Sequence, residues 1–283
     1  MSSNNIQPQV PLKMDHNRLQ IDTESLKQFS NVGYTSIPSF FDQDEIKALQ
    51  KEVERFKKMG LIQNVATDGD GETPSTDKAN LQLIPLHDKS KLIRALPFEN
   101  KVVGAITQLI GQPAVLHLDQ MFLKPGKHGI GTSWHQDNAY FKIGNPLGGT
   151  AMWVAIHDAN ISNGTICVIP GSHREKYEHF RDPNSNHHIR CQVPEEEAVP
   201  IELNAGGVAF FCYGTAHCTT RNNTDFERAG MAFHFLRSDS ATASQMQDGK
   251  PLISGSSCSF GKNEYGTSQQ GRWRKEVENI LTK

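Results

Sequence analysis

The chain has 283 residues, of which 36% are hydrophobic and 21% charged, and its formal net charge is −2 at pH 7. This length and composition predict a globular protein with one large domain, or at most two small ones, and a substantial buried core. The near-zero charge argues against a nucleic-acid partner or an anionic membrane surface, because each would require a basic excess. A small-molecule ligand is compatible with it, since an anionic one needs only one or two local cations.

Three features of the sequence favour a cytoplasmic protein. The first twenty residues lack the apolar stretch of a secretory signal, and no run approaches the roughly 18 consecutive apolar residues that span a membrane. The cysteine count is odd and no Cys-x-x-Cys pair occurs, which argues against a disulfide framework and against a cysteine zinc site. The cysteines are Cys167, Cys191, Cys212, Cys218 and Cys258. The sequence leaves the oligomeric state of the protein open.

The chain begins with a polar segment rich in Asn, Gln and Ser, so residues 1–20 are expected to be a flexible arm and residues 21–283 a single domain. The next residues predict a short helix from Asp22 to Phe29 and an extended segment from Tyr34 to Phe41. Residues 64–80 contain Asp-Gly-Asp-Gly and Thr-Pro-Ser, which is typical of a polar loop.

The clearest predicted helix begins at Asp42. Asp42 and Glu45 have the spacing of a capping box, in which side chains satisfy the free N–H groups of the first turn. Gly60 is a suitable end for this helix, and a second helix is expected from Phe98 to Ile110. Apolar residues recur at helical spacing and predict one buried face, formed by Ile46, Leu49, Val53, Phe56 and Met59.

After Pro113 the chain changes to short runs of β-branched and aromatic residues separated by turn residues. Helices followed by many short strands argue against a doubly wound sheet and favour a β-sandwich or barrel with N-terminal helical support. A last helix is expected from Arg272 to Leu281. The predicted strands are Ala114–Leu123, Thr150–Ile156, Thr165–Ile169, Val199–Leu203, Gly207–Tyr213 and Gly230–Leu236.

His135 and Asp137 form a His-x-Asp pair whose side chains would share one face of a strand. A third ligand from a distant strand would complete a site of two histidines and one carboxylate, which leaves positions open and suits iron(II). His217, which follows the apolar run 208–211, is a candidate for that ligand. The alternatives are a surface His-x-Asp pair and a histidine that is simply buried in the core.

Thr219 and Arg228 follow His217 at short spacing. A buried guanidinium can hold a carboxylate through paired hydrogen bonds, and a nearby hydroxyl can add another. The alternative is a surface ion pair of Arg228 with Asp225 or Glu227, which the spacing alone slightly favours.

Taken together, these segments resemble the phytanoyl-CoA dioxygenase family of iron(II)- and 2-oxoglutarate-dependent oxygenases. The resemblance runs from about Leu26 to Arg237. It rests on the segments Trp134-His135-Gln136-Asp137, Asn163-Gly164 and Val168-Ile169-Pro170-Gly171-Ser172-His173, and on the spacing of His217, Thr219 and Arg228.

The resemblance implies a mainly β fold, a double-stranded β-helix of the jelly-roll or cupin type. It implies that His135, Asp137 and His217 bind Fe(II), and that Arg228 and Thr219 bind the distal carboxylate of 2-oxoglutarate. The expected reaction uses dioxygen, releases succinate and CO2, and hydroxylates an unactivated C–H bond. The carboxylate of Asp137 disfavours a halide ligand, whereas desaturation, ring closure and epimerisation stay open.

Polar and aromatic residues around these positions are expected to line a substrate pocket, which suggests a small and partly polar metabolite. Arg190, with His187 and His188, could meet an anionic group such as a carboxylate or phosphonate, unless this segment is a solvated loop. Substrate identity is left open. The candidate substrate residues are Gln120, Phe122, Asn138, Tyr140, Trp153 and His234, with His128 and Thr132 as further candidates.

Two other functions are compatible with the same residues. One is a cupin-like metal-dependent isomerase or hydrolase, which would not need Arg228. The other is a non-catalytic barrel that binds a small molecule. Metal content would separate the first from an oxygenase, and succinate release would separate the second.

Overall fold

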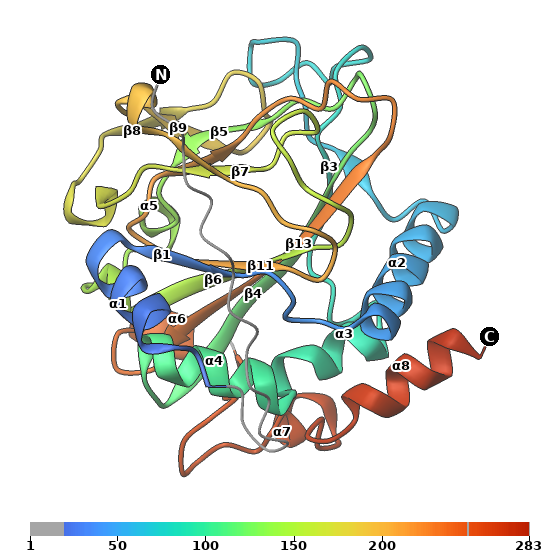
Figure 1. Ribbon diagram of the computed structural model, residues 1–283, viewed down its shortest axis with the longest axis vertical. Coiled ribbons are helices and arrows are strands. Elements are labelled where there is room, and N and C mark those ends of the chain that lie inside the picture. Colours follow the sequence, from blue (N-terminus) through green and yellow to red (C-terminus); the bar gives the residue numbers. More distant parts are fainter. Residues whose placement is uncertain (1–19, 248, 283) are drawn as a thin grey trace.

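The computed structural model describes residues 20–247 and 249–282. The arm expected over residues 1–20 therefore lies almost entirely outside the described residues, and the division into an arm and one domain stays a prediction. Two antiparallel sheets face each other, and helices cover the outer face of the larger sheet (Figure 1). This arrangement confirms the predicted mainly β fold, a double-stranded β-helix with helical support.

The larger sheet has seven strands and contains the longest pairing in the fold. They are β1 (Tyr34–Ile37), β2 (Gln63–Asn64), β3 (Leu81–Leu83), β4 (Ala114–Lys124), β6 (Gly149–Ala155), β11 (Val208–Cys212) and β13 (Arg228–Arg237). Their order is β1-β11-β6-β13-β4-β3-β2. The pairing of β13 with β4 runs from Arg228 opposite Lys124 to Arg237 opposite Ala114. It therefore sets the register of the two strands along their whole length.

The smaller sheet carries the segments that the motifs singled out. Its strands are β5 (Thr132–His135), β7 (Ile166–Val168), β10 (Val199–Ile201) and β12 (His217–Thr219), in the order β10-β7-β12-β5. A separate hairpin of β8 (His179–Arg181) and β9 (Ile189–Cys191) lies beside β5. This hairpin contains Arg190, for whose segment a solvated loop was the alternative.

Side chains alternate between the two faces of the central strands, so these strands are buried on both sides. On β6, Met152 and Val154 pack with the helices, whereas Trp153 turns to the space between the sheets. Phe210 and Phe211 on β11 divide in the same way. The space between the sheets is therefore lined by one face of each, and that is where the candidate site lies.

All four predicted helices are present, with shifted ends. The first predicted helix continues to Val32, and the helix expected from Phe98 begins at Asn100 after a 3-10 turn. The α-helices are α1 (Thr23–Val32), α2 (Gln43–Lys58), α3 (Lys91–Ala95), α4 (Asn100–Ile110), α5 (Asn138–Phe141), α6 (Ala243–Gln247), α7 (Lys262–Tyr265) and α8 (Trp273–Leu281). The 3-10 helices are η1 (Leu96–Phe98), η2 (Pro146–Gly148), η3 (Ser172–Arg174) and η4 (Glu195–Glu197).

The capping box predicted for α2 is present and forms part of a larger buried network. The Asp42 side chain accepts from the Glu45 N–H at 2.9 Å, and the Glu45 carboxylate accepts from the Asp42 N–H at 2.8 Å. Glu45 is only 1% exposed, and it also accepts from Trp273 Nε1 at 2.6 Å and Lys101 Nζ at 2.5 Å. A single carboxylate thus ties α2 to α4 and α8.

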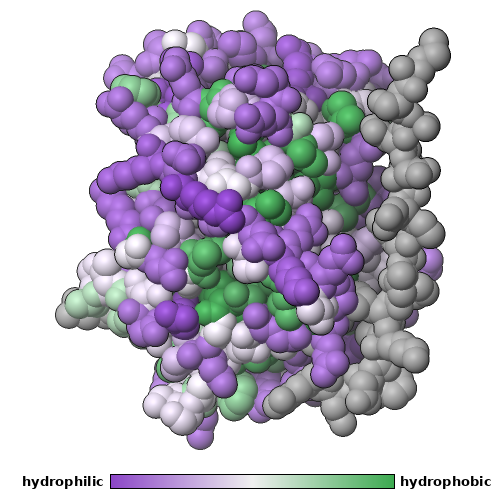
Figure 2. All heavy atoms as spheres, turned by 60° about the vertical axis from the view of Figure 1, so that its left-hand side comes forward, coloured by the Kyte–Doolittle hydropathy of each residue, from purple (hydrophilic) through white to green (hydrophobic). Residues whose placement is uncertain are grey.

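The surface agrees with a domain whose apolar residues lie mostly inside. On the face shown in Figure 2, hydrophilic side chains surround smaller groups of hydrophobic ones. Over residues 20–247 and 249–282, each helix is too short or too polar to cross a bilayer.

The Glu45 network predicts the effect of a substitution on stability. Glu45→Ala should lower the free energy of unfolding by about 3–5 kcal/mol, because it leaves the half-buried Lys101 without its carboxylate and the buried Trp273 without its acceptor. Urea denaturation followed by tryptophan fluorescence would measure this change. The matched control is Glu54→Ala on the same helix, whose exposed pair with Lys57 should contribute about 1 kcal/mol or less. Equal losses in the two variants would contradict a special role for Glu45.

Candidate metal centre

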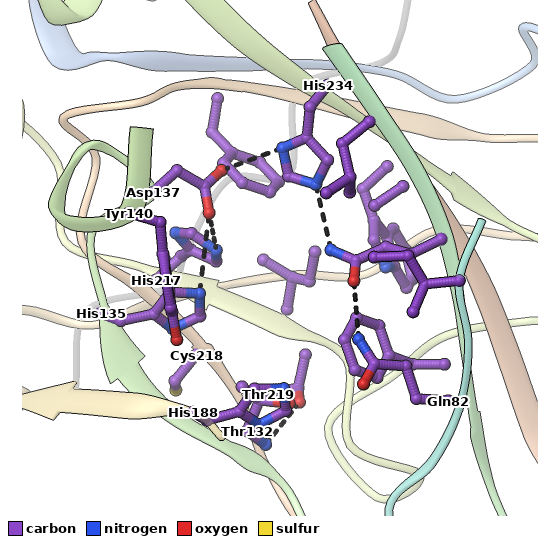
Figure 3. Close-up of a pocket in the computed structure, with 18 of the residues that line it drawn as sticks. Gln82, Thr132, His135, Asp137, Tyr140, His188, His217, Cys218, Thr219 and His234 are labelled. Carbon is purple, nitrogen blue, oxygen red and sulfur yellow. Dashed lines mark hydrogen bonds and ion pairs between the residues drawn. The ribbon is translucent and has the colours of Figure 1, made fainter. Parts of the chain in front are cut away.

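Three candidate ligands converge at one point between the sheets. β5 and β12 are antiparallel neighbours with His135 directly opposite His217, and their ring centroids are 4.2 Å apart. Asp137 Oδ1 lies 3.7 Å from His135 Nε2 and 3.8 Å from His217 Nε2. One ligand atom from each residue lies within 4.8 Å of the others, and the three side chains point toward one another (Figure 3).

The expected reason for this convergence was wrong in one respect. Asp137 does not continue β5, which ends at His135. It has φ −56° and ψ −32° and forms the N-terminal end of α5. The carboxylate meets the imidazole because the chain turns into a helix there, and not because alternate residues of a strand share a face.

Neighbouring backbone groups fix the orientation of both imidazoles. His135 Nδ1 lies 2.8 Å from the Ser133 carbonyl, and His217 Nδ1 lies 3.0 Å from the Thr215 carbonyl. Each Nδ1 must therefore carry the hydrogen, which leaves the Nε2 lone pairs directed at the point shared with Asp137.

The ligand atoms that meet at this point make no hydrogen bonds to one another, as expected for groups that bind a metal ion. Distances of 3.7 and 3.8 Å are too long for hydrogen bonds, and Asp137 Oδ2 is buried without a hydrogen-bond partner. Burial lowers the pKa of His135 to about 3, so its imidazole is neutral. Burial alone would raise the pKa of Asp137, but His217 and His234 outweigh it and the net shift is downward. Two neutral imidazoles and one carboxylate are the protonation states that a divalent ion requires.

Gln136, between the two ligands, was not recognised from the sequence. Its side-chain N–H groups donate to the Gly214 carbonyl at 2.6 Å and the Glu175 carbonyl at 2.9 Å. The side chain is 5% exposed. It therefore joins the turn that carries Asp137 to the turn that precedes His217.

A row of polar side chains continues from Asp137 along the cavity wall. His234 Nδ1 on β13 lies 3.4 Å from Asp137 Oδ2, a contact too poorly aligned for a hydrogen bond. His234 Nε2 is 3.1 Å from the Gln120 side-chain nitrogen, and Gln82 donates to the Gln120 oxygen at 2.8 Å. The row is visible in Figure 3. Gln120 donates to Nε2, so the hydrogen of His234 sits on Nδ1 and faces Asp137.

Arg228 lies at the other end of the same cavity. Its side chain is 1% exposed, it donates to the Gly164 carbonyl, and its Nε has no hydrogen-bond partner. Burial lowers the pKa of Arg228 to about 10. A buried guanidinium without an acidic partner is costly, which fits a bound anion at this place.

The surface ion pair that was the alternative for Arg228 is excluded. Glu227 pairs with Lys57 at 2.8 Å, and Asp225 pairs with Lys127 at 3.3 Å. Arg228 instead lies 5.5 Å from the ring of Trp153, which forms the floor beside it.

Thr219 and Gly230 complete the surroundings of Arg228. The Thr219 hydroxyl lines the cavity and accepts from the Thr132 N–H at 3.0 Å, so its own hydrogen can serve a ligand. A side chain at position 230 would place its Cβ 2.5 Å from Trp153 Cζ2. Glycine at position 230 therefore leaves the space that Trp153 occupies next to the guanidinium.

Lys124 is a second buried cation that the sequence did not reveal. It is the β-sheet partner of Arg228 and is 1% exposed. Its ammonium donates to the carbonyls of Thr220 and Gly164, and burial holds its pKa well below the usual value. Lys124 thus fixes the segments on either side of Arg228 without lining the cavity.

The cavity between the two ends has a volume of about 200 Å³. Most predicted substrate residues line it, namely Gln120, Phe122, Tyr140, Trp153, His234 and Thr132. The lining residues that the sequence did not reveal come from strands, loops and the helix α5 and share no motif; they are Gln82, Ile84, Leu118, Phe141, Ile166, Phe211, Cys218 and Ala232.

Asn138 and His128 do not line the cavity, so their expected role is corrected. The Asn138 amide bonds both backbone groups of Ile143, at 2.9 and 3.1 Å, and closes the turn after α5. His128 is exposed, with Nδ1 3.3 Å from the Asp77 carbonyl.

His187, His188 and Arg190 lie in two different places, which the sequence did not indicate. His187 and His188 line the cavity, whereas Arg190 is exposed and borders a separate depression beside Trp134. The Tyr140 hydroxyl accepts from the Ile189 N–H at 2.9 Å and so joins α5 to the hairpin. The three residues expected to meet an anion therefore do not act as one group.

Comparison with known proteins agrees with this geometry. Residues 29–230 match the family model described as phytanoyl-CoA dioxygenase (PhyH). The ectoine dioxygenase of Stutzerimonas stutzeri (strain A1501) is 24% identical over 263 residues, which cover 86% of this chain and 85% of that protein.

Two solved structures share the fold. The epimerase SnoN in complex with Fe3+, alpha-ketoglutarate and nogalamycin RO has a TM-score of 0.63 and 21% identity, over 76% of this chain and 82% of that one. EctD from S. alaskensis with 2-oxoglutarate and 5-hydroxyectoine has a TM-score of 0.61 and 21% identity, over 83% and 82%.

The buried His188 predicts how stability depends on pH. Burial and the nearby His187 lower the pKa of His188 from 6.5 to about 3. The unfolded chain then binds a proton that the folded chain does not, so stability present above pH 6.5 is lost as the pH falls toward 3. The metal-free protein should lose about 1.4 kcal/mol per pH unit from this group.

His188→Asn should remove that contribution. Urea denaturation at pH 6.5, 5.5 and 4.5 should give a dependence on pH that is shallower by about 1.4 kcal/mol per unit in the variant. Parallel curves for the two proteins would show that His188 is not held neutral by the fold.

Proposed function

Since this chain belongs to the phytanoyl-CoA dioxygenase family of iron(II)- and 2-oxoglutarate-dependent enzymes, we propose that it hydroxylates an unactivated C–H bond of a small, partly polar metabolite. The observation that carries the proposal is one cavity with a buried two-histidine, one-carboxylate cluster at one end and an unpaired buried arginine at the other. Few other functions would need both a metal-binding cluster and a buried arginine in one cavity.

In the proposed enzyme, His135, Asp137 and His217 hold the iron. When bound, iron(II) and 2-oxoglutarate supply an oxidant from dioxygen, with succinate and CO2 as by-products. The neutral imidazoles and the ionised carboxylate are already in the state that binding requires. A carboxylate in place of a small residue also argues for hydroxylation rather than halogenation.

Arg228 and Thr219 are proposed to bind the distal carboxylate of 2-oxoglutarate. The Arg228 Nε has no partner, and an acid placed there would receive a charge-assisted hydrogen bond from a group already desolvated. Trp153 packs beneath the guanidinium and limits its movement. The residues thus set the direction in which the co-substrate lies along the cavity.

The substrate is proposed to bind against the cavity wall formed by Gln120, Gln82 and Phe122. Among the described residues that line the cavity, a carboxylate or a guanidinium is carried only by Asp137 and Arg228, and both are assigned to the cofactors. Because Arg190 points elsewhere, we narrow the substrate to a polar molecule whose buried part carries no negative charge. The expected carboxylate or phosphonate would have to face solvent.

The first test is anaerobic loading with iron(II) and 2-oxoglutarate, followed by the weak visible charge-transfer band of their complex. Wild type should show the band. His217→Ala should abolish it by removing an iron ligand. Arg228→Ala should raise the Kd for 2-oxoglutarate by at least about 30-fold, because losing one partner of a buried charge pair costs about 2–5 kcal/mol.

The matched control is Arg221→Ala, since Arg221 is an exposed arginine that donates to the Lys127 carbonyl. It should bind 2-oxoglutarate as wild type does. A folded, iron-loaded wild type without the band would overturn the assignment, and equal losses in the two arginine variants would remove Arg228 from the co-substrate site.

His234 is expected to act through Asp137 rather than on the substrate. His234→Leu should weaken iron(II) binding about 10- to 100-fold, since outer residues that orient a ligand typically have effects of that size. Anaerobic titration of metal-free protein would measure the Kd without turnover. His234→Gln should retain part of the affinity, and His128→Leu, remote from the cavity, should retain all of it. An unchanged Kd in His234→Leu would make His234 a wall residue only.

A further inference from the structure

Two cysteines face each other across neighbouring strands of the smaller sheet. In the antiparallel pairing of β12 with β7, Cys218 is the direct partner of Cys167. Both are free thiols, of which Cys167 is half-buried and Cys218 is buried. Among the strand pairings of the described residues, this is the one place where two cysteines are opposite each other.

The spacing of this pair is suited to a disulfide. Directly opposed residues of an antiparallel pair have Cα atoms about 4.5–5.5 Å apart. Disulfides join residues whose Cα atoms are about 4.4–6.8 Å apart. A bond between Cys167 and Cys218 would therefore require adjustment of side chains and strand twist, and not a rearrangement of the fold.

The pair is accessible to a small oxidant from outside the cavity. Cys167 is half-buried, and Cys218 borders both the cavity and a surface depression that includes Trp134 and Arg221. Cys167 is the more exposed of the two thiols, so it is the one that the oxidant reaches first.

Cys218 lies on β12 between two residues of the proposed active site. His217 precedes it and Thr219 follows it, so a bond at Cys218 acts on a proposed iron ligand and on a proposed 2-oxoglutarate contact. β12 has three residues, and its register with β5 shifts between His217 and Thr219. Its pairing with β7 is regular, so a new covalent bond on that side can move the whole strand.

We propose that Cys167 and Cys218 form a thiol-oxidation site, at which a hydroperoxide joins β7 to β12 by a disulfide and thereby weakens iron binding at His217. The oxidation itself is independent of the proposed function, whereas its effect on iron rests on that function. Regulation of this kind would slow the enzyme when peroxide accumulates and would be reversed by thiols.

The chemistry balances with hydrogen peroxide as the oxidant. The Cys167 sulfur attacks one peroxide oxygen, the O–O bond breaks, and water leaves as Cys167 becomes a sulfenic acid. The Cys218 sulfur then attacks the Cys167 sulfur, the S–O bond breaks, and a second water leaves. Two thiols are oxidised by two electrons, and one peroxide is reduced to two waters.

The test uses the full-length, metal-free protein, so that iron cannot react with the peroxide. After treatment with hydrogen peroxide and then catalase, free thiols are alkylated and the digest is analysed by mass spectrometry. The expected product is one linked peptide pair containing Cys167 and Cys218. Linkage through other cysteines, or over-oxidation of Cys167 without linkage, would overturn the site.

The second readout is the Kd for iron(II), titrated anaerobically before and after oxidation. We expect oxidation to raise it at least tenfold and dithiothreitol to restore it. Cys167→Ser should form no linkage and keep its Kd after peroxide, whereas the controls Cys191→Ser and Cys258→Ser should respond as wild type does. A linked protein with an unchanged Kd would overturn the regulatory effect. Failure of reduced wild type to bind iron would instead overturn the proposed function, and the linkage would still decide the oxidation site.

Discussion

The pairing of β12 with its two neighbours is the constraint on which the site depends. Because β12 lies between β5 and β7, His217 is held opposite His135 even though the two are far apart in the sequence. The same short strand places Thr219 against Thr132 at the cavity wall. A displacement of β12 would therefore disturb both ends of the cavity at once, which no single loop could do.

The site also contains several buried polar and charged groups whose burial lowers the stability of the folded chain, and the rest of the fold must offset this loss. Asp137 has a buried oxygen with no hydrogen bond, and Arg228 and Lys124 are adjacent buried cations without an acid. Such groups destabilise a folded chain unless a ligand pairs with them. The apolar contacts between the larger sheet and the helices supply the compensating stability, since they lie on the opposite face of the same strands.

The sequence was most informative where a local rule determines the structure. The capping box at Asp42 and the strand runs after Pro113 depend on neighbours in sequence, and they are present as predicted. The convergence of His135, Asp137 and His217 could be predicted because their spacing resembles a family pattern, although the assumed strand geometry at Asp137 was incorrect. Gln136 and Lys124 could not be assigned, because their roles depend on carbonyl groups of distant segments. Asn138 was misplaced for a related reason, since a turn to Ile143 uses its amide.

The buried carboxylate of Glu45 has a consequence for the order in which the chain matures. Trp273 is fully buried and donates to this carboxylate, so α2 cannot complete its packing until α8 has been synthesised. During translation the barrel strands are available long before that helix, and the outer face of α2 stays open in the meantime. The nascent chain therefore exposes the apolar surface of α2 until α8 follows, and the contact between these two helices forms only after the barrel strands have been made.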